Sequence, residues 1–137
     1  MAGQLADLQR RLAAHADPVC AALTPYRIVD ADPEAGMVVI AFDAQPAFAN
    51  HQGHVQGGLA VAMLDAVISI AAFAKLDAWL PTIEIKASFL APLPVSGCRG
   101  EGRVVKAGRR VVFVEARLLA DGQPAVTASA TVIGPGG

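Results

Sequence analysis

A polar, glycine-rich loop followed by an apolar segment with one carboxylate has the residue types best suited to chemistry in this sequence. The loop covers residues 50–58 and reads Asn-His-Gln-Gly-His-Val-Gln-Gly-Gly. The apolar segment covers residues 59–74 and contains a single acid, Asp65. A carboxylate is almost never fully buried without a partner, because loss of its hydration is costly. Asp65 is therefore exposed at a helix edge, bonded to a neighbour such as Ser69 one turn later, or functional.

The Gly57-Gly58 pair stands where a helix is expected to begin. Backbone N–H groups in the first turn of a helix have no intrahelical acceptor and lie at the positive end of the dipole, so they favour a negatively charged oxygen. Asp65 follows Gly57 by just over two helical turns. One helix would thus carry an anion-stabilising end and a carboxylate able to act as a base or nucleophile.

The elements around this segment follow from hydrophobic periodicity and turn residues. The apolar segment predicts a central helix from about residue 57 to residue 75 or 76, buried on most sides because it lacks a polar face. Strands are expected at residues 26–29, 37–42, 82–89, 98–106, 110–120 and 125–133. In the strand 82–89, alternation places Ile83, Ile85, Ala87 and Phe89 on one face and Thr82, Glu84, Lys86 and Ser88 on the other.

These elements predict an α+β domain spanning residues 1–137. About five to six antiparallel strands wrap around one long helix, because the helix is apolar nearly all round and the strands are apolar on one face. Residues 1–24 form a helical extension on the surface, with Leu5, Leu8 and Leu12 at helical spacing. Residues 134–137 are expected to form a flexible tail.

Composition and charge restrict the functional classes. The net charge of −1 gives no indication of nucleic-acid binding. A hydrophobic fraction of 54% in 137 residues favours burial of some apolar surface against a second copy of the chain. Seven of the eleven basic residues lie between Pro81 and Arg117, which suits an anionic ligand and equally suits a solvated strand face.

The sequence gives no sign of a metal site, secretion or membrane insertion. Cys20 and Cys98 are isolated and lack metal-type or redox-type spacing, so they are expected to be reduced residues of a cytoplasmic protein. The N-terminus has no continuous apolar core and is not a secretory signal. The apolar segment of sixteen residues is shorter than the roughly 20 residues that cross a bilayer.

The loop, the helix and the strand at 82–92 together carry a family resemblance. The loop and helix supply a spaced motif, formed by Asn50, Gly53, Gln56, Gly57, Gly58 and Asp65. This motif and the following strand resemble the hotdog-fold acyl-CoA thioesterases of the phenylacetate-pathway type, over residues 48–133. Many members have His before the Gly-Gly pair, where this chain has Gln56; related enzymes that act on aromatic acyl-CoAs can use Gln there.

The resemblance implies a catalytic arrangement shared between two subunits. The Gly57 N–H would polarise the thioester carbonyl, and Asp65 would activate a water molecule, the favoured route, or attack directly. Asn50, Gln56 and Gly57 of one subunit would face Asp65 and Thr82 of the partner subunit. Asn50 and Gln56 would orient the acyl group or the water, and Thr82 would hold the water.

The resemblance also implies the substrate contacts and the assembly. An acyl pocket would be lined by Gly58, Met63, Val67 and Phe89. Of the seven basic residues after Pro81, Arg109 and Arg110 are the better candidates to contact the phosphates of coenzyme A because their turn is exposed, and the sequence leaves open which of the seven is used. Coenzyme A is then part of the substrate, and no separate cofactor or metal is expected. The chain is expected to form a homodimer that assembles further into a homotetramer.

Two alternatives to a thioesterase remain open at this stage. A His in the loop before a helix carboxylate also resembles hotdog hydratases and dehydratases, in which His51 and Asp65 would share acid–base work. Those enzymes usually have Pro-Gly before the helix and Glu on it, whereas this chain has Gly57-Gly58 and Asp65. The second alternative is a module that binds acyl-CoA without turning it over.

Overall fold

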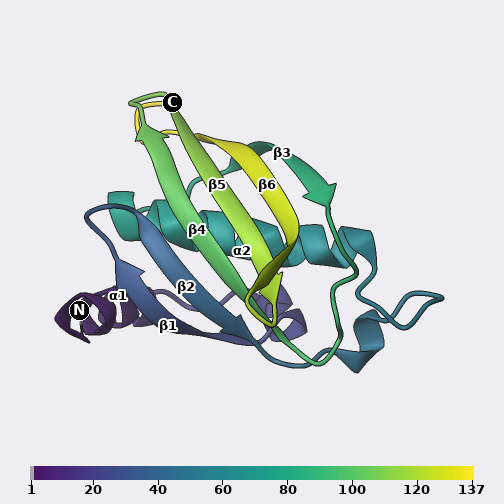
Figure 1. The fold of residues 1–137 in the computed structure, drawn as a ribbon. Coiled ribbons are helices and arrows are strands. Elements are labelled where there is room, and N and C mark those ends of the chain that lie inside the picture. Colours follow the sequence, from purple (N-terminus) through teal and green to yellow (C-terminus); the bar gives the residue numbers. More distant parts are fainter. Residues whose placement is uncertain (1) are drawn as a thin grey trace.

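Six strands form one antiparallel sheet in a computed structural model of the chain, which describes residues 2–137 (Figure 1). The strands are β1 (Tyr26–Asp32), β2 (Met37–Phe42), β3 (Thr82–Phe89), β4 (Cys98–Ala107), β5 (Val111–Ala120) and β6 (Gln123–Ile133). Their order across the sheet is β1-β2-β4-β5-β6-β3, so β1 and β3 are the edge strands. The expected hotdog architecture is confirmed.

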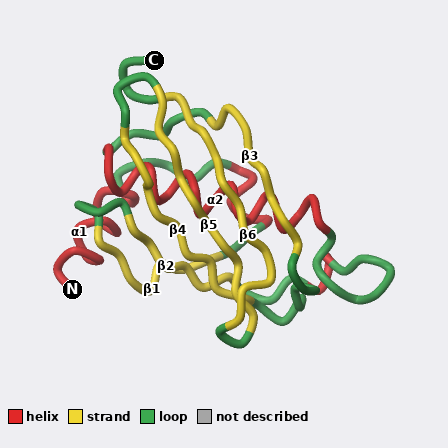
Figure 2. The backbone as a smooth tube through the Cα atoms, turned by 45° about the horizontal axis from the view of Figure 1, so that its top comes forward, coloured by secondary structure: helices red, strands yellow, loops and turns green. Residues whose placement is uncertain are grey.

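The helix α2 (Gly57–Leu76) crosses under the strands, as both backbone views show (Figures 1 and 2). It is long and apolar enough to span a membrane by length and composition alone. Here it is instead the core helix of the sheet, because ten of its residues are buried. The helix begins at Gly57 as predicted, and it ends where Asp77 adopts a left-handed conformation with φ 54°.

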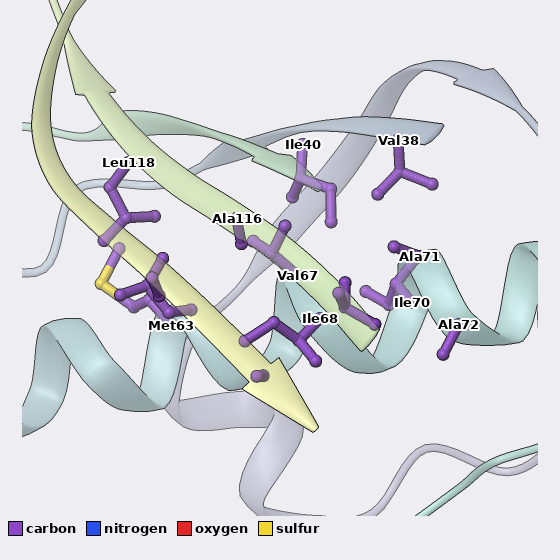
Figure 3. Packing of buried hydrophobic residues seen from close by; sticks show 14 of the residues in the cluster. Val38, Ile40, Met63, Val67, Ile68, Ile70, Ala71, Ala72, Ala116 and Leu118 are labelled. Atoms are coloured by element: carbon purple, nitrogen blue, oxygen red, sulfur yellow. The ribbon is translucent and has the colours of Figure 1, made fainter. Parts of the chain in front are cut away.

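The helix lies directly on the backbone of β4. A Cβ atom added at Gly100 would lie 2.5 Å from a methyl group of Val67, and one added at Gly102 would lie 2.8 Å from the other methyl group. Val67 is fully buried and, in Figure 3, rises from α2 toward Ala116 of β5. Glycine on β4 therefore sets how closely the helix approaches the sheet.

The helix α1 (Ala2–Ala13) packs against β1 and against the end of α2 rather than lying free on the surface. Leu8 is fully buried. The Arg11 guanidinium donates hydrogen bonds to the Asp77 carboxylate at 3.0 Å and to the Ala74 carbonyl oxygen at 3.2 Å. A cation at the C-terminal end of a helix is favourable for the dipole, so Arg11 connects α1 to the last turn of α2. A short 3-10 helix (Val19–Leu23) follows.

Register shifts interrupt the pairing of neighbouring strands at four places, and two of them change what simple alternation predicts for the site. A register shift between Ile28 and Asp30 keeps β1 paired as far as Asp32, beyond the expected end at residue 29. A second shift lies between Thr82 and Glu84 in β3, where Thr82 pairs with Val132. Because a bulge inserts an extra residue, it reverses the alternation of side chains beyond it.

The expected faces of β3 are therefore wrong at its first two residues. Thr82 lies on the face that meets α2, together with Ile85, Ala87 and Phe89. Ile83, which alternation placed on that face, has 56% of its surface exposed. The bulge thus brings a hydroxyl group to the helix.

We predict that Gly100→Ala destabilises the fold by about 1–3 kcal/mol, because the added methyl group overlaps Val67. Urea unfolding should show that Gly100→Ala and Val67→Ala together cost less than the sum of the two single variants, since truncation of Val67 makes room. Gly3→Ala is the control, because nothing lies within 4 Å of a Cβ at Gly3. Strictly additive costs would contradict this packing.

Candidate active site

The N-terminus of α2 presents unused N–H groups. The side-chain oxygen of Gln56 caps the helix by accepting a hydrogen bond from the Leu59 N–H at 3.1 Å. The N–H groups of Gly57 and Gly58 have no acceptor among residues 2–137. The Phe89 ring covers Gly57, and a Cβ added there would lie 3.4 Å from the ring. Gly57 therefore offers a hydrogen-bond donor beside an aromatic wall.

The loop before the helix is fixed by hydrogen bonds to one side-chain atom. Asn50 Oδ1 accepts from the N–H groups of Gln52 at 2.9 Å and of His54 at 3.1 Å. The Asn50 N–H donates to the His54 carbonyl oxygen at 2.7 Å, and the Val55 N–H to the Leu93 carbonyl oxygen at 2.8 Å. Two N–H donors identify this atom of Asn50 as the oxygen, so its NH2 group is left without a partner in the described chain.

A cavity of about 380 Å³ lies between this loop and the end of β3. Its wall combines the polar loop with an apolar side, and it is lined by Asn50, Gln52, His54, Val55, Gly57, Ala60, Phe89, Leu90, Ala91, Pro92, Leu93 and Val126. Of the expected site residues, Asn50, Gly57 and Phe89 meet here. Sequence reasoning missed the wall at residues 90–93, for which the only signal was the break at Pro92-Leu93-Pro94.

Asp65 is half-buried and bonded to a strand. Its Oδ1 accepts a hydrogen bond from the Thr82 hydroxyl at 2.8 Å, rather than from Ser69. Its other carboxylate oxygen has no partner within the described residues. The bulge at Ile83 is the cause of this pairing, because without it Thr82 would lie on the opposite face of the sheet.

Within one subunit, Asn50 and Gly57 lie far from Asp65 and Thr82. Eight residues of helix separate Gly57 from Asp65, a rise of about 12 Å. Thr82 and Phe89 likewise stand at opposite ends of β3, separated by about 23 Å. The structure therefore pairs Asp65 with Thr82 and places Asn50 and Gly57 on one cavity, and it does not bring these two groups together.

Several expected contact residues lie away from the cavity. Met63 is 3% exposed and belongs with Val67 to the packed core, as the labelled side chains of Figure 3 show. Arg109 and Arg110 occupy the turn between β4 and β5. Their carbonyl oxygens accept hydrogen bonds from the N–H groups of Gly136 and Gly134, and they line neither described cavity. Gly58 is exposed at the start of α2.

The face of the sheet turned away from α2 is charged. It carries ion pairs between Arg103 and Glu115 at 3.0 Å and between Arg117 and Glu101 at 2.7 Å. These four residues and Lys86 are among those that line a hollow of about 850 Å³. Because exposed ion pairs contribute little to stability, the pairs mainly balance the charge of this face.

Other candidate groups are not placed for catalysis. His51 is exposed at the loop and lines neither described cavity. Burial raises the pKa of the Cys98 thiol to about 11, so this thiol is protonated at neutral pH and is a poor nucleophile. Across residues 2–137, no group of three or more His, Cys, Asp or Glu side chains is placed to hold a metal ion.

Comparison with known proteins identifies the family. The profile of the thioesterase superfamily matches residues 52–127, more than half of the chain. A phenylacetic acid degradation-related protein of Ralstonia eutropha JMP134, assigned as a thioesterase, is 34% identical, with a TM-score of 0.83. The alignment covers 91% of this chain and 96% of that protein. No curated protein matches the sequence.

Two further solved structures share the fold. A thioesterase family protein of Silicibacter pomeroyi is 28% identical, covers 96% of each chain and has a TM-score of 0.74. A Streptococcus mutans UA159 protein bound to acetyl-CoA is 18% identical and has a TM-score of 0.72, over 80% of this chain and 87% of that one. The chain therefore belongs to the thioesterase superfamily, and it is a hotdog-fold thioester hydrolase of the phenylacetate-pathway type.

Proposed function

We propose that this protein hydrolyses an acyl-CoA thioester to the free acid and coenzyme A, at a site shared between two subunits. The observation that carries the proposal is the spacing on α2, where unused N–H groups at Gly57 and a carboxylate at Asp65 stand about 12 Å apart. A donor to the carbonyl oxygen and a base for the attacking water must both lie within a few ångströms of one thioester. A second copy of the chain supplies the missing half.

The edge of the sheet at β3 supports such an assembly. β3 has no partner on its outer side within the described chain. Ile83 and Phe89 of β3 and Leu90, which follows the strand, are exposed apolar residues. An edge strand with this composition favours pairing with another chain. Pairing of β3 with the β3 of a second copy, in a two-fold dimer, would bring the Thr82 end of one strand toward the Phe89 end of the other.

The residues then divide the reaction between the subunits. The N–H of Gly57 and the free NH2 group of Asn50 donate hydrogen bonds to the thioester carbonyl. The carboxylate of Asp65 of the partner subunit takes a proton from water, whose oxygen adds to the acyl carbon. Thr82 of the partner subunit holds one oxygen of that carboxylate and leaves the other for the water. The C–S bond then breaks and the acid forms.

The same arrangement suggests where the substrate lies. The apolar wall of the cavity beside Gly57 suits the acyl group, and Phe89 closes one side of it. The turn at Arg109 and Arg110 lies at the Thr82 end of β3, because Val111 pairs with Ile133 and the Ile133 N–H bonds to the carbonyl oxygen of Pro81. In the dimer, this turn of the partner subunit would approach the cavity and suit the phosphates of coenzyme A. The acetyl-CoA bound by the Streptococcus mutans protein supports this class of ligand.

The first test is thiol release from a panel of aromatic and aliphatic acyl-CoAs, followed with a free-thiol reagent. We expect wild-type protein to release coenzyme A and Asp65→Asn to lose at least about 100-fold in kcat, because the base is removed while the hydrogen bond to Thr82 is kept. Circular dichroism should show an unchanged fold. Equal turnover by Asp65→Asn would falsify the role of this carboxylate, and enoyl-CoA hydration in place of thiol release would support a hydratase.

Gly57→Pro tests the backbone donor itself. Proline removes the N–H and is tolerated at the first position of a helix, and Gln56 already has the extended conformation that precedes proline, with ψ 137°. We expect kcat to fall by about 10²–10³. Gly57→Ala, which keeps the N–H, is the matched control and should retain activity. Loss of the same size in both variants would show that bulk beneath Phe89, and not the donor, matters.

Mixing two inactive variants tests whether the site is shared. Gly57→Pro and Asp65→Asn chains, unfolded and refolded together, should recover about a quarter of wild-type activity, because about half of the dimers are mixed and each holds one intact site. A site within one subunit would recover none, since every site would then carry one of the two substitutions. Each variant refolded alone is the control.

Asn50 should show separable roles in structure and catalysis. Asn50→Asp keeps an oxygen for the N–H groups of Gln52 and His54 but removes the NH2 group. We expect it to lower kcat/KM at least about tenfold, with an unchanged Tm. Asn50→Ala should lose activity and also about 1 kcal/mol of stability, because two N–H groups lose their acceptor. Full activity in Asn50→Asp would show that Asn50 only holds the loop.

A further inference from the structure

His54 is the ionisable residue of the cavity beside Gly57. The wall contains no Asp, Glu, Lys or Arg from the loop, from α2, from residues 89–93 or from β6. Asn50 and Gln52 are its other polar side chains, and neither changes charge. Imidazole is the side chain whose charge ordinarily changes between pH 5 and pH 8. Among the side chains of this wall, the one whose chemistry suits proton donation is therefore His54.

The backbone of His54 is held in place by hydrogen bonds, while its imidazole ring has no partner among the described residues. Its N–H donates to Asn50 Oδ1 at 3.1 Å, and its carbonyl oxygen accepts from the Asn50 N–H at 2.7 Å. It also forms a β-bridge with Pro94. The imidazole has no hydrogen-bond or ion-pair partner among residues 2–137, although the residue is half-buried. Thus the backbone holds the loop, and the ring remains available to a ligand.

Thioester hydrolysis in this cavity would be helped by a proton donor. Thioester hydrolysis first places negative charge on the carbonyl oxygen, which Gly57 faces, and then on the departing sulfur. Most of the wall is apolar, including Val55, Phe89 and Leu93. An anion formed against apolar surroundings is costly unless it is neutralised. Within this wall, the imidazole of His54 is the side chain that can supply a proton to the sulfur. The proposed site holds one other proton donor, the carboxyl group that Asp65 of the partner subunit forms when it takes a proton from water.

We propose that His54 is a catalytic residue that donates a proton to the thiolate leaving group, an assignment that rests on the proposed acyl-CoA hydrolysis. Asp65 of the partner subunit takes a proton from water, and the water oxygen bonds to the acyl carbon. When the C–S bond breaks, its electron pair goes to sulfur and the imidazolium proton follows, giving the free thiol and a neutral imidazole. Solvent then reprotonates His54 and accepts the proton held by Asp65.

The test compares His54→Gln with wild type at about pH 6 on two thioesters of one acid: the acyl-CoA that wild type hydrolyses fastest in the panel above, and the thiophenyl ester of the same acid. We expect kcat/KM for the CoA ester to fall roughly tenfold or more in His54→Gln. Thiophenol is a more acidic thiol that leaves without protonation. The variant should therefore hydrolyse its ester within about twofold of wild type.

His51→Gln is the matched control, because His51 is in the same loop, is exposed and lines neither cavity. It should match wild type with both esters. A defect of His54→Gln that is equal for the two esters would overturn proton donation to sulfur, as would full activity of the variant on the CoA ester. In the same assay, Asp65→Asn should lose activity toward both esters. If wild type and Asp65→Asn do not differ, the proposed function fails and this assignment fails with it.

Discussion

The rigid spacing along α2 is the constraint on which the rest of the structure depends. A continuous hydrogen-bonded helix fixes the rise from Gly57 to Asp65, and no side-chain motion can shorten it. The sheet holds that helix in place because Gly100 and Gly102 let Val67 contact the β4 backbone directly. In the proposed dimer, the N–H groups at Gly57 of one helix and the Asp65 carboxylate of the partner helix would act on the same thioester. The exposed apolar residues at the β3 edge would then be covered by the partner subunit.

Much of the fold could be predicted from residue patterns. The run of small aliphatic residues at 59–74 indicated a buried helix, and the strands expected at residues 110–120 and 125–133 correspond to β5 and β6. The turn between β1 and β2 is shorter than the expected residues 30–36, and Thr82 lies on the opposite face of β3 from the one expected. Both differences have the same cause, because a β-bulge depends on pairing with another strand. Alternation within one strand contains no information about its partner.

The candidate site was predictable only in part, for a similar physical reason. Gly57, Asn50 and Asp65 could be singled out because their residue types conflict with an apolar helix or leave donors uncovered. The cap formed by Gln56 was not expected, because a side chain that turns back on its own helix is not distinguished in sequence from one that faces a ligand. Met63 resembled a pocket residue by position, but it packs beneath the sheet. The wall at residues 90–93 depends on a loop-to-loop contact between Val55 and Leu93.

β3 carries Thr82 at one end and Phe89 at the other, about 23 Å apart. In the proposed dimer, each copy of this strand therefore belongs to two active sites, contributing the hydroxyl beside the base in one and the aromatic wall in the other. Because a strand is stiff along its axis, a displacement of Phe89 in one site would be felt at Thr82 and at the Asp65 carboxylate that it holds in the other. Each strand of such a dimer would thus join its two sites.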